Sequence, residues 1–427
     1  MILTHTKDEE LKARAEKVIP GGMYGHESTR LLPANYPQYI ARAKGARMWD
    51  ADGNEYIDYM CAYGPNLFGY ANEAIDAAAV AQLARGDAAT GPAPLMVDLA
   101  EAFVAQVSHA DWAMFCKNGT DATTMAMTVA RAHTGKRKIL VATGAYHGAA
   151  PWCTPLPSGT LPEDRAHVVH YTYNDIESLD AAVKSAAGDL AGIFASPFKH
   201  DAFQDQQDVD AAYARRAREH CDRTGALLIV DDVRAGFRLA RDSSWSLVGV
   251  APDLSSWGKC IANGHAISAL LGAEKAREAA SSIFVTGSFW FAAVPMAAAL
   301  KTLELIRTTK YLEHTQTMGR DLRIGLQQQA AAHGFTLRQT GPEQMPQILF
   351  EDDPDFRLGF AWAEEACARG IYLHPWHNMF ICAALTEGDA RQTLTTTDEA
   401  FAAVKKRRAT LKPHPTVVAM LSAHLGH

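Results

Sequence analysis

Several features are scarce in this sequence, and each scarcity excludes a class of protein. The seven cysteines are scattered, odd in number and free of C-x-x-C pairs, so we expect reduced thiols rather than a disulfide framework. The net charge is -7 and no long Lys/Arg cluster occurs, which argues against a nucleic-acid partner. The longest apolar stretch, Phe289 to Leu300, is interrupted by Pro295 and is too short to cross a bilayer. The charged segment 1–17 has no apolar signal core, so we expect a cytoplasmic protein.

Familiar nucleotide and metal fingerprints are also missing. The run Thr134-Gly135-Lys136-Arg137 lacks the earlier glycine and the following Ser/Thr of a Walker A motif. No G-x-G-x-x-G follows a predicted strand, which weakens a dinucleotide-dependent oxidoreductase but leaves it as an alternative. No set of His, Cys and carboxylate residues has a metal-ligand spacing, so we expect no metal site.

The central part of the chain has the pattern of an α/β domain. With 427 residues, of which 48% are hydrophobic and 21% charged, the chain is long enough for two domains. Between about residues 71 and 288, short apolar runs alternate with amphipathic helices, which predicts a mostly parallel, mixed sheet flanked by helices on both faces. The runs are Trp112–Phe115, Ile139–Ala142, Leu190–Phe194, Leu227–Val230 and Ile267–Leu271.

The two chain ends have a different, mixed pattern. We predict a surface helix over residues 6–18 and a hairpin over residues 46–59, whose turn contains Asp52-Gly53. Further predicted elements are helices over residues 296–308 and 312–333 and strands over residues 347–350 and 380–383. The expected division is therefore an N-terminal segment (1–70), a large domain (71–294) and a C-terminal part (295–427), with a small α+β domain built from both ends.

Lys259 carries most of the functional argument. It lies on a turn of small residues, downstream of the apolar run Leu227–Val230, which ends in Asp231 and Asp232. Ligands of open α/β sheets bind at the carboxyl ends of strands. Pyridoxal phosphate needs a lysine amine that forms an imine with its aldehyde, and an acid that keeps its ring nitrogen protonated. The alternatives are a solvated surface lysine and an acid that caps a turn.

Two further motifs suit the same cofactor. Asn118, Gly119 and Thr120 follow a strand and open a helix, so they would bind a phosphate at the helix N-terminus unless they are an ordinary cap. Tyr146 and His147 lie between glycines, where an aromatic ring has room to stack on a planar cofactor. The alternative for this second motif is a glycine-rich turn with a half-buried aromatic pair.

Taken together, these motifs resemble the class III (fold type I) pyridoxal-phosphate aminotransferases, in particular the glutamate-1-semialdehyde aminomutase-like branch. The resemblance extends from about residue 20 to about residue 389, with its landmarks in family order. They are Pro20-Gly21-Gly22, Trp49 to Asp58, Tyr63-Gly64-Pro65 with Gly69, Asn118 to Ala122, Tyr146-His147-Gly148, Asp231-Asp232-Val233 with Gly236-Phe237-Arg238, Pro252-Asp253-Leu254 with Gly258-Lys259, and Thr286-Gly287-Ser288.

The resemblance implies a role for each matching residue. Lys259 would form the imine with the cofactor and shuttle the proton between the substrate Cα and the cofactor C4′, and Asp231 would pair with the pyridinium nitrogen. Val233 and Tyr146 would contact opposite faces of the ring. Ser288 would reach the cofactor phosphate of a neighbouring subunit, which implies a homodimer with shared active sites. Gly119 and Thr120 would bind the phosphate through backbone and hydroxyl.

Other positions depart from the family pattern or are only loosely aligned. Arg234 stands where a small or apolar residue is common, and Asp232 replaces the more frequent Glu. For the substrate, the resemblance suggests Arg30 as a carboxylate binder and Tyr63 as a pocket aromatic. His374 and His377 belong to an aromatic group that would line the pocket mouth.

The expected reaction is transfer of an amino group between a small amino acid or amine and a keto or aldehyde acceptor. An intramolecular aminomutase and an amino-acid racemase or epimerase begin with the same Cα deprotonation, so the sequence leaves them as alternatives. A relative that keeps the fold without turnover is disfavoured, because Lys259, Asp231 and Tyr146 occur together.

Overall fold

The computed structural model describes residues 3–201 and 203–425, and the chain divides into two compact units. Unit 1 combines residues 1–63, 67–72 and 313–427, and unit 2 comprises residues 64–66 and 73–312. The boundary between unit 2 and the C-terminal part of unit 1 lies at 312/313, later than the expected 294/295. The reason is that α8 (Ala293–Thr308) packs against α2 (Glu73–Leu83) and α3 (Leu95–Gln106) within unit 2.

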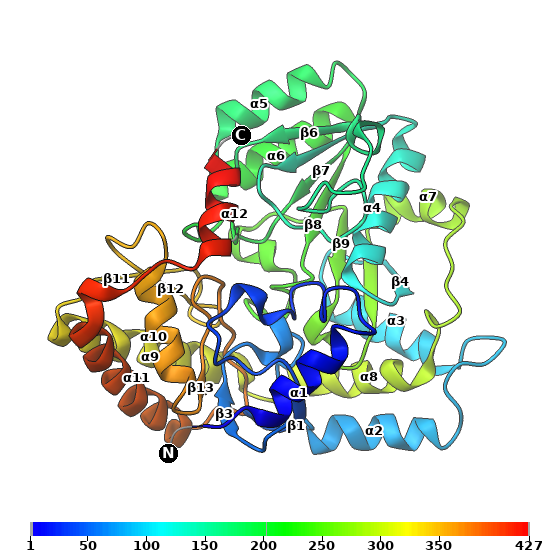
Figure 1. Cartoon of the computed structure of the whole chain (residues 1–427). Coiled ribbons are helices and arrows are strands. Elements are labelled where there is room, and N and C mark those ends of the chain that lie inside the picture. Colours follow the sequence, from blue (N-terminus) through cyan, green and yellow to red (C-terminus); the bar gives the residue numbers. More distant parts are fainter. Residues whose placement is uncertain (1–2, 202, 426–427) are drawn as a thin grey trace. The chain divides into compact units, whose positions relative to one another are not determined.

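Unit 2 is built on a seven-stranded sheet with the order β4-β10-β9-β8-β7-β5-β6 (Figure 1). Neighbouring strands from β9 to β6 are parallel, whereas β10 is antiparallel to both of its neighbours. The strands are β4 (Trp112–Cys116), β5 (Lys138–Ala142), β6 (Val168–Tyr171), β7 (Leu190–Ala195), β8 (Leu227–Asp231), β9 (Leu254–Trp257) and β10 (Ser268–Gly272). The expected α/β fold with a mostly parallel, mixed sheet is confirmed.

Alternate residues of each strand face two different helical layers. Ile139 and Val141 of β5 pack in a core with α4 (Gly119–Thr134) and α7 (Arg277–Ser282). Leu140 and Ala142 pack in a second core with α5 (Ile176–Ser185) and α6 (Ala211–Thr224), on the opposite side of the sheet in Figure 1. Because both faces are covered, the central strands read as continuous apolar runs, which is the pattern that the sequence analysis used.

Unit 1 is an α+β assembly of both chain ends. It has a four-stranded sheet with the order β1-β2-β3-β13 and a two-stranded sheet, β11-β12. The predicted hairpin is confirmed as β2 and β3, and its turn is held by the Asp50 carboxylate, which accepts from the amide of Asn54 at 2.8 Å. The elements are α1 (Thr6–Ala15), β1 (Ile40–Lys44), β2 (Arg47–Asp50), β3 (Glu55–Asp58), α9 (Tyr311–His333), β11 (Leu337–Thr340), β12 (Gln347–Phe350), α10 (Arg357–Cys367), β13 (Ile371–Tyr372), α11 (Glu387–Arg407) and α12 (Pro415–Leu425).

One predicted strand of unit 1 is wrong. Residues 380–382 are apolar and buried and Ala383 is half-buried, but the segment has no strand pairing, because its amides donate to three separate segments. The Phe380 amide donates to the Tyr59 carbonyl, that of Ile381 to Gln344 and that of Ala383 to Leu67. Apolar composition predicted burial here, whereas strand identity depends on a partner strand that only the fold supplies.

Within residues 3–201 and 203–425, no helix combines the length and the apolar character needed to cross a bilayer.

Candidate functional site

The predicted catalytic residues come together at one edge of the unit 2 sheet. The parallel strands β5, β7, β8 and β9 end at the same edge, and Asp231 is the last residue of β8. Asp231 pairs with Ser256 of β9, and Lys259 follows that residue by three positions. His147 lies in the loop after β5 and reaches the same carboxylate. This is the edge at which open α/β sheets bind ligands.

Lys259 is half-buried and has an unusual backbone. It begins a short 3-10 helix, Lys259–Ala262, with a left-handed φ of 49°. Such a conformation costs a non-glycine residue about 1–3 kcal/mol and is concentrated at functional sites. The preceding Gly258 is tightly enclosed, since a Cβ there would lie 2.7 Å from Ser268 Oγ and 3.3 Å from Val233 Cγ1. The lysine is therefore held at a fixed, strained position.

Asp231 is buried and held by two hydrogen bonds. Its Oδ2 lies 2.7 Å from Nδ1 of His147, which is only 2% exposed. Its Oδ1 accepts from the Val233 amide at 3.2 Å. The orientation of the carboxylate is thus fixed by a ring on one side and by backbone on the other, as expected of an acid that must face a ring nitrogen.

The N-terminus of α4 offers two free amides. Asn118 and Asp121 form a capping box, in which Asn118 Oδ1 accepts from the Asp121 amide and Asp121 Oδ2 accepts from the Asn118 amide, both at 3.1 Å. The Asn118 side chain, expected to bind the cofactor, is occupied in this cap. The amides of Gly119 and Thr120 have no partner among the described residues, and amides at a helix N-terminus attract a phosphate.

The loop that carries Tyr146 is tied to the first turn of the same helix. Thr123 Oγ1 donates to the His147 carbonyl at 2.7 Å, and Thr120 Oγ1 accepts from the Ala149 amide at 3.1 Å. Tyr146 itself is 41% exposed, so its ring has free surface. No motif in the sequence pointed to Thr123, which lies one helical turn after Gly119.

These groups fit pyridoxal phosphate, the cofactor expected from the sequence. The Gly119 and Thr120 amides suit its phosphate, and the Asp231 carboxylate suits a protonated ring nitrogen. The half-buried amine of Lys259 suits the aldehyde. The absence of a side chain at Gly119 lets the start of α4 lie close to Val233. A Cβ on Gly119 would lie 2.8 Å from Val233 Cγ1 and would narrow the space between the helix and Val233.

Arg234, which was not predicted as a site residue, lies close enough to Asp231 for their charges to interact. Arg234 is half-buried, and burial lowers the pKa of Arg234 to about 10 against the opposing effect of Asp231, Tyr146 and Asp201. Its Nη1 donates to the His200 carbonyl at 3.5 Å. Burial, and to a smaller extent the positive charge of Arg234, hold the pKa of His200 well below its usual value. This imidazole is therefore neutral. The sequence feature that could have pointed to Arg234 is its departure from the family pattern, in which a small or apolar residue is common at this position.

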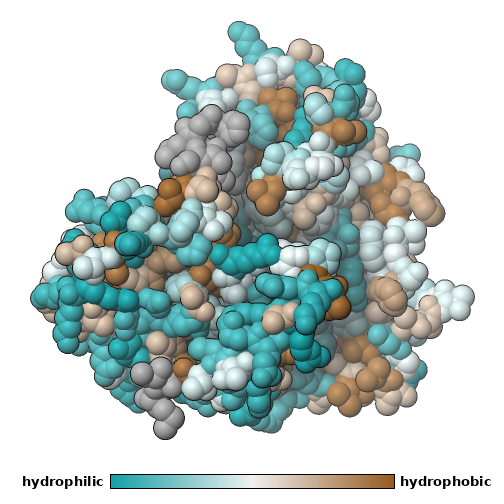
Figure 2. Space-filling view, in the orientation of Figure 1, coloured by the Kyte–Doolittle hydropathy of each residue, from teal (hydrophilic) through white to brown (hydrophobic). Residues whose placement is uncertain are grey.

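Ser288 lies outside this group, on the segment between α7 and α8. It is exposed, and the same segment presents Phe284 at 92% and Phe289 at 65% exposure. On α2, Val80 and Leu83 are 65% and 59% exposed, and Figure 2 shows brown apolar surface over this helix at the lower right. Large apolar side chains that gather on a surface indicate an interface.

Three of the four candidate substrate residues belong to one cluster in unit 1. The Tyr63 ring contacts His377 and His374 edge-on, with centroids 5.6 and 6.3 Å apart. His26, which the sequence analysis missed, contacts Tyr63 at 4.6 Å, and Trp376 contacts His374 at 4.5 Å. These five residues are named the aromatic cluster below.

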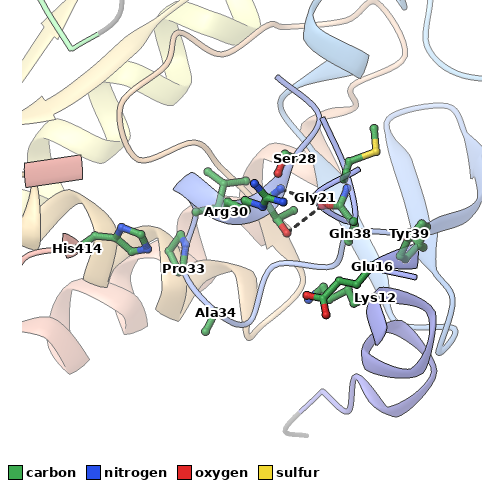
Figure 3. A pocket seen from close by; sticks show the side chains of 14 residues that line it. Lys12, Glu16, Gly21, Ser28, Arg30, Pro33, Ala34, Gln38, Tyr39 and His414 are labelled. Atoms are coloured by element: carbon green, nitrogen blue, oxygen red, sulfur yellow. Dashed lines mark hydrogen bonds between the residues drawn. The ribbon is translucent and has the colours of Figure 1, made fainter. Parts of the chain in front are cut away.

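The fourth candidate, Arg30, also lies in unit 1 (Figure 3), beside Leu31, whose carbonyl accepts from Nε1 of Trp376 at 3.2 Å. Arg30 lines a cavity of about 360 Å³ with residues that include Glu16, Ser28 and His414, and no member of the aromatic cluster lines it. The guanidinium lies so close to Gly21 that a Cβ there would be 2.3 Å from Arg30 Nη2. The assignment of Arg30 to a substrate carboxylate stays a prediction.

No group of three or more His, Cys, Asp and Glu side chains within the described ranges is arranged to hold a metal ion.

Comparison with known proteins identifies the family. The sequence model of the family described as aminotransferase class-III matches residues 32–386. An "aminopentol aminotransferase" of Sphingopyxis macrogoltabida is 61% identical over 418 residues, which cover 98% of this chain and 99% of the relative. A glutamate-1-semialdehyde 2,1-aminomutase of Leptothrix cholodnii is 30% identical over 428 residues, covering 91% of this chain and 97% of the relative.

A solved structure agrees with these relatives. The internal aldimine form of the FumI protein of Sphingopyxis sp. MTA144, with pyridoxal phosphate, superposes with a TM-score of 0.96 at 61% identity, covering 96% of this chain and 100% of that one. The alternative of a dinucleotide-dependent oxidoreductase is therefore wrong. The chain belongs to the class-III aminotransferases, a family of pyridoxal-phosphate-dependent enzymes.

Proposed function

We propose that this aminotransferase works through Lys259, with Asp231 and His147 as the acid and its orienting partner. The observation that carries the proposal is the convergence of an amine, a buried carboxylate and two free helix amides at one sheet edge. When bound, pyridoxal phosphate supplies an electron-poor ring that accepts the electron pair left by Cα deprotonation.

Each protein group then has a defined task. With the cofactor bound, the Nζ atom of Lys259 would be the base that moves the proton between the substrate Cα and C4′. The Asp231 carboxylate, oriented by His147 at 2.7 Å, keeps the proton on the ring nitrogen. The amides of Gly119 and Thr120 hold the phosphate, while Val233 and Tyr146 enclose the ring plane.

Transfer to a second molecule is the favoured reaction. The relative at 61% identity is an aminotransferase, whereas the aminomutase is 30% identical. The name of the first relative, aminopentol aminotransferase, refers to an amine that bears hydroxyl groups. We therefore propose a hydroxylated amine as a candidate amino donor for this chain. The acceptor is a keto or aldehyde compound.

A homodimer is part of the proposal. The exposed Phe284 and Phe289 flank Ser288, so a second copy that covers them would bring Ser288 to an interface. The family resemblance assigns this serine to the cofactor phosphate of the neighbouring subunit.

Reduction by borohydride followed by peptide mapping tests the proposal. A pyridoxyl group on Lys259 supports it, and labelling of a different lysine contradicts it. Incubation with an amine and a keto acid separates the reaction classes. A ketone formed only when an acceptor is present indicates aminotransfer, an isomer indicates a mutase, and inverted chirality alone indicates a racemase.

A further inference from the structure

A buried carboxylate lies against the start of the loop that carries Tyr146. It belongs to Asp201, in the connection between β7 and α6 of unit 2, and its side chain is only 9% exposed. An ideal Cβ on Gly144, two residues after β5, would lie 2.6 Å from Oδ2 and 3.0 Å from Cγ of Asp201. The acid therefore touches this glycine and leaves no room for a side chain at position 144.

Gly144 also has a backbone conformation that favours glycine. Its φ is 82°, and the Ala145 amide donates to the Ala142 carbonyl at 3.1 Å, which closes a four-residue turn. Tyr146 directly follows this turn. The direction in which the chain leaves β5, and with it the start of Tyr146, therefore depends on the turn that Asp201 packs against.

The other side of Tyr146 along the chain is fixed by hydrogen bonds of His147. The ring of His147 lies 2.7 Å from Asp231, and its carbonyl accepts from Thr123 Oγ1 at 2.7 Å. The contact between Asp201 and Gly144 acts before the tyrosine, so Tyr146 lies between two restraints that come from different connections of the sheet.

Two cations hold the Asp201 carboxylate in place. Lys199 Nζ lies 3.8 Å from Asp201 Oδ2 and donates to Gln204 Oε1 at 3.0 Å. The backbones of Lys199 and Gln207 exchange two hydrogen bonds, of 2.8 and 3.1 Å, which fix the base of this connection. Arg234, in the connection after β8, attracts the same carboxylate. The acid thus has a defined position against the turn.

Burial of this acid is unfavourable by itself. It raises the pKa of Asp201, and the charges of Lys199, Arg234 and His147 oppose that rise. Aspartate is rarely buried in proteins unless it is paired, and buried acids with a shifted pKa concentrate at functional sites. The protein therefore maintains a costly carboxylate beside the loop that is expected to cover the cofactor ring.

We propose that Asp201 is a positioning residue for Tyr146: its carboxylate, held by Lys199, packs against Gly144 and sets the position from which the tyrosine ring covers the cofactor. The proposal rests on the proposed function, because it assumes that Tyr146 encloses the ring plane. Asp201 acts through the loop and not on the reacting atoms.

A double-mutant cycle tests whether Asp201 acts through Tyr146. Asp201→Ala, Tyr146→Leu and the double variant are prepared as full-length apoproteins and titrated with pyridoxal phosphate. We expect Asp201→Ala to raise the Kd about 3- to 10-fold, the scale of coupling between residues that share a contact. In the Tyr146→Leu background the same substitution should change the Kd less than about 2-fold, because the ring that it positions is absent. Asp208→Ala removes an exposed carboxylate of the same connection and is the matched control.

Substitution of Gly144 tests the contact itself. Gly144→Ala brings a methyl group against the Asp201 carboxylate, so the Kd should rise at least about 10-fold, and adding Asp201→Ala should recover part of this loss. Gly135→Ala places a methyl group at a glycine with a φ of 66° and no atom within 4 Å, so it measures the effect of backbone strain alone. No recovery in the double variant would show that the carboxylate does not control the turn.

A spectroscopic readout separates positioning from a general loss of stability. The visible circular dichroism of the bound cofactor reports the asymmetry of the groups around its ring. We expect Asp201→Ala and Tyr146→Leu to change this band in the same direction, and Asp208→Ala to leave it as in the wild type. Far-ultraviolet circular dichroism of each variant checks that the fold is retained.

The two proposals fail in different ways. An unchanged Kd and an unchanged cofactor band in Tyr146→Leu contradict the role of this ring in the proposed function, as borohydride labelling away from Lys259 contradicts the role of the lysine. A clear loss in Tyr146→Leu, combined with no effect of Asp201→Ala or with an equal effect in both backgrounds, overturns the role of Asp201 alone.

Discussion

The Nδ1 atom of His147 lies 2.7 Å from Oδ2 of Asp231, and the two residues are 84 positions apart in the sequence. The pair joins the loop after β5 to the last residue of β8, across the intervening strand β7. Because hydrogen bonds to a carboxylate fix its orientation, we expect the affinity for the cofactor to depend on this contact.

Loss of the imidazole should therefore weaken cofactor binding. His147→Leu removes the donor to Asp231, and we expect the Kd of the apoprotein for pyridoxal phosphate to rise about 10- to 100-fold, as for a hydrogen bond to a charged group. His147→Asn places an amide N–H at the Nδ1 position and should recover most of the affinity. Fluorescence titration measures both, and equal Kd values for wild type and His147→Leu would contradict the role.

The contact between Thr123 and the His147 carbonyl gives a second prediction. Thr123→Val keeps the shape of the side chain but removes the 2.7 Å hydrogen bond to the His147 carbonyl, so it leaves a buried carbonyl unsatisfied and loosens the loop that carries Tyr146. We expect a loss of about 1–3 kcal/mol in the free energy of unfolding and a weaker hold on the cofactor. Thr128→Val, on the same helix, removes only a contact with the carbonyl of Thr124 and is the matched control.

Gly119 gives a third prediction, at the phosphate end. In Gly119→Ala the new methyl group would lie 2.8 Å from Val233 Cγ1, so the helix terminus or Val233 must shift. We expect the Kd for pyridoxal phosphate to rise at least about 10-fold, because the two free amides move from their positions. Gly91→Ala meets no atom within 4 Å and should leave the Kd unchanged. Equal effects of both substitutions would argue against a phosphate site at α4.

The raised pKa of the buried Asp232 carboxyl leads to a fourth prediction, a dependence of the free energy of unfolding on pH. Burial raises the pKa of Asp232 to about 7 from 3.8, so the folded protein binds this proton more tightly than the unfolded chain. Its contribution to stability is complete below the unfolded pKa and is lost as pH rises through about 7. Asp232→Asn keeps an acceptor for Ser243 and Ser244 but does not ionise.

The stability of this variant relative to wild type should therefore increase between about pH 5 and about pH 8.5. Urea unfolding of the apoproteins at both values measures the difference. A constant difference would show that Asp232 does not titrate in this range.

The proposed dimer gives a fifth prediction. Phe289 is 65% exposed beside Ser288, and Phe289→Asp would place a charge in the interface. We expect light scattering to show a shift from dimer toward monomer, with reduced cofactor affinity. Ile324→Asp changes a residue of α9 that is 51% exposed and serves as the control. A wild-type protein that is monomeric at micromolar concentration would contradict the dimer.

The sequence by itself determined the α/β class and the positions along the chain of five strands of the large sheet, and it predicted the residues of the cofactor site. This was possible because most strands buried on both faces are apolar, and because Asp231 directly follows the apolar run Leu227–Val230, with Lys259 on a turn of small residues downstream. The chemistry of pyridoxal phosphate then restricts which residues serve, since it requires an amine and an acid.

The tertiary structure decided what depends on distant partners. Residues 380–383 are apolar, yet they form no strand because three separate carbonyls take their amides. The Asn118 side chain accepts a hydrogen bond in its own helix cap, so the proposed phosphate site consists of backbone amides, whose availability a sequence does not display. Arg30 lines a cavity that no member of the aromatic cluster lines, because side-chain direction and long-range packing, rather than local composition, determine which residues share a surface.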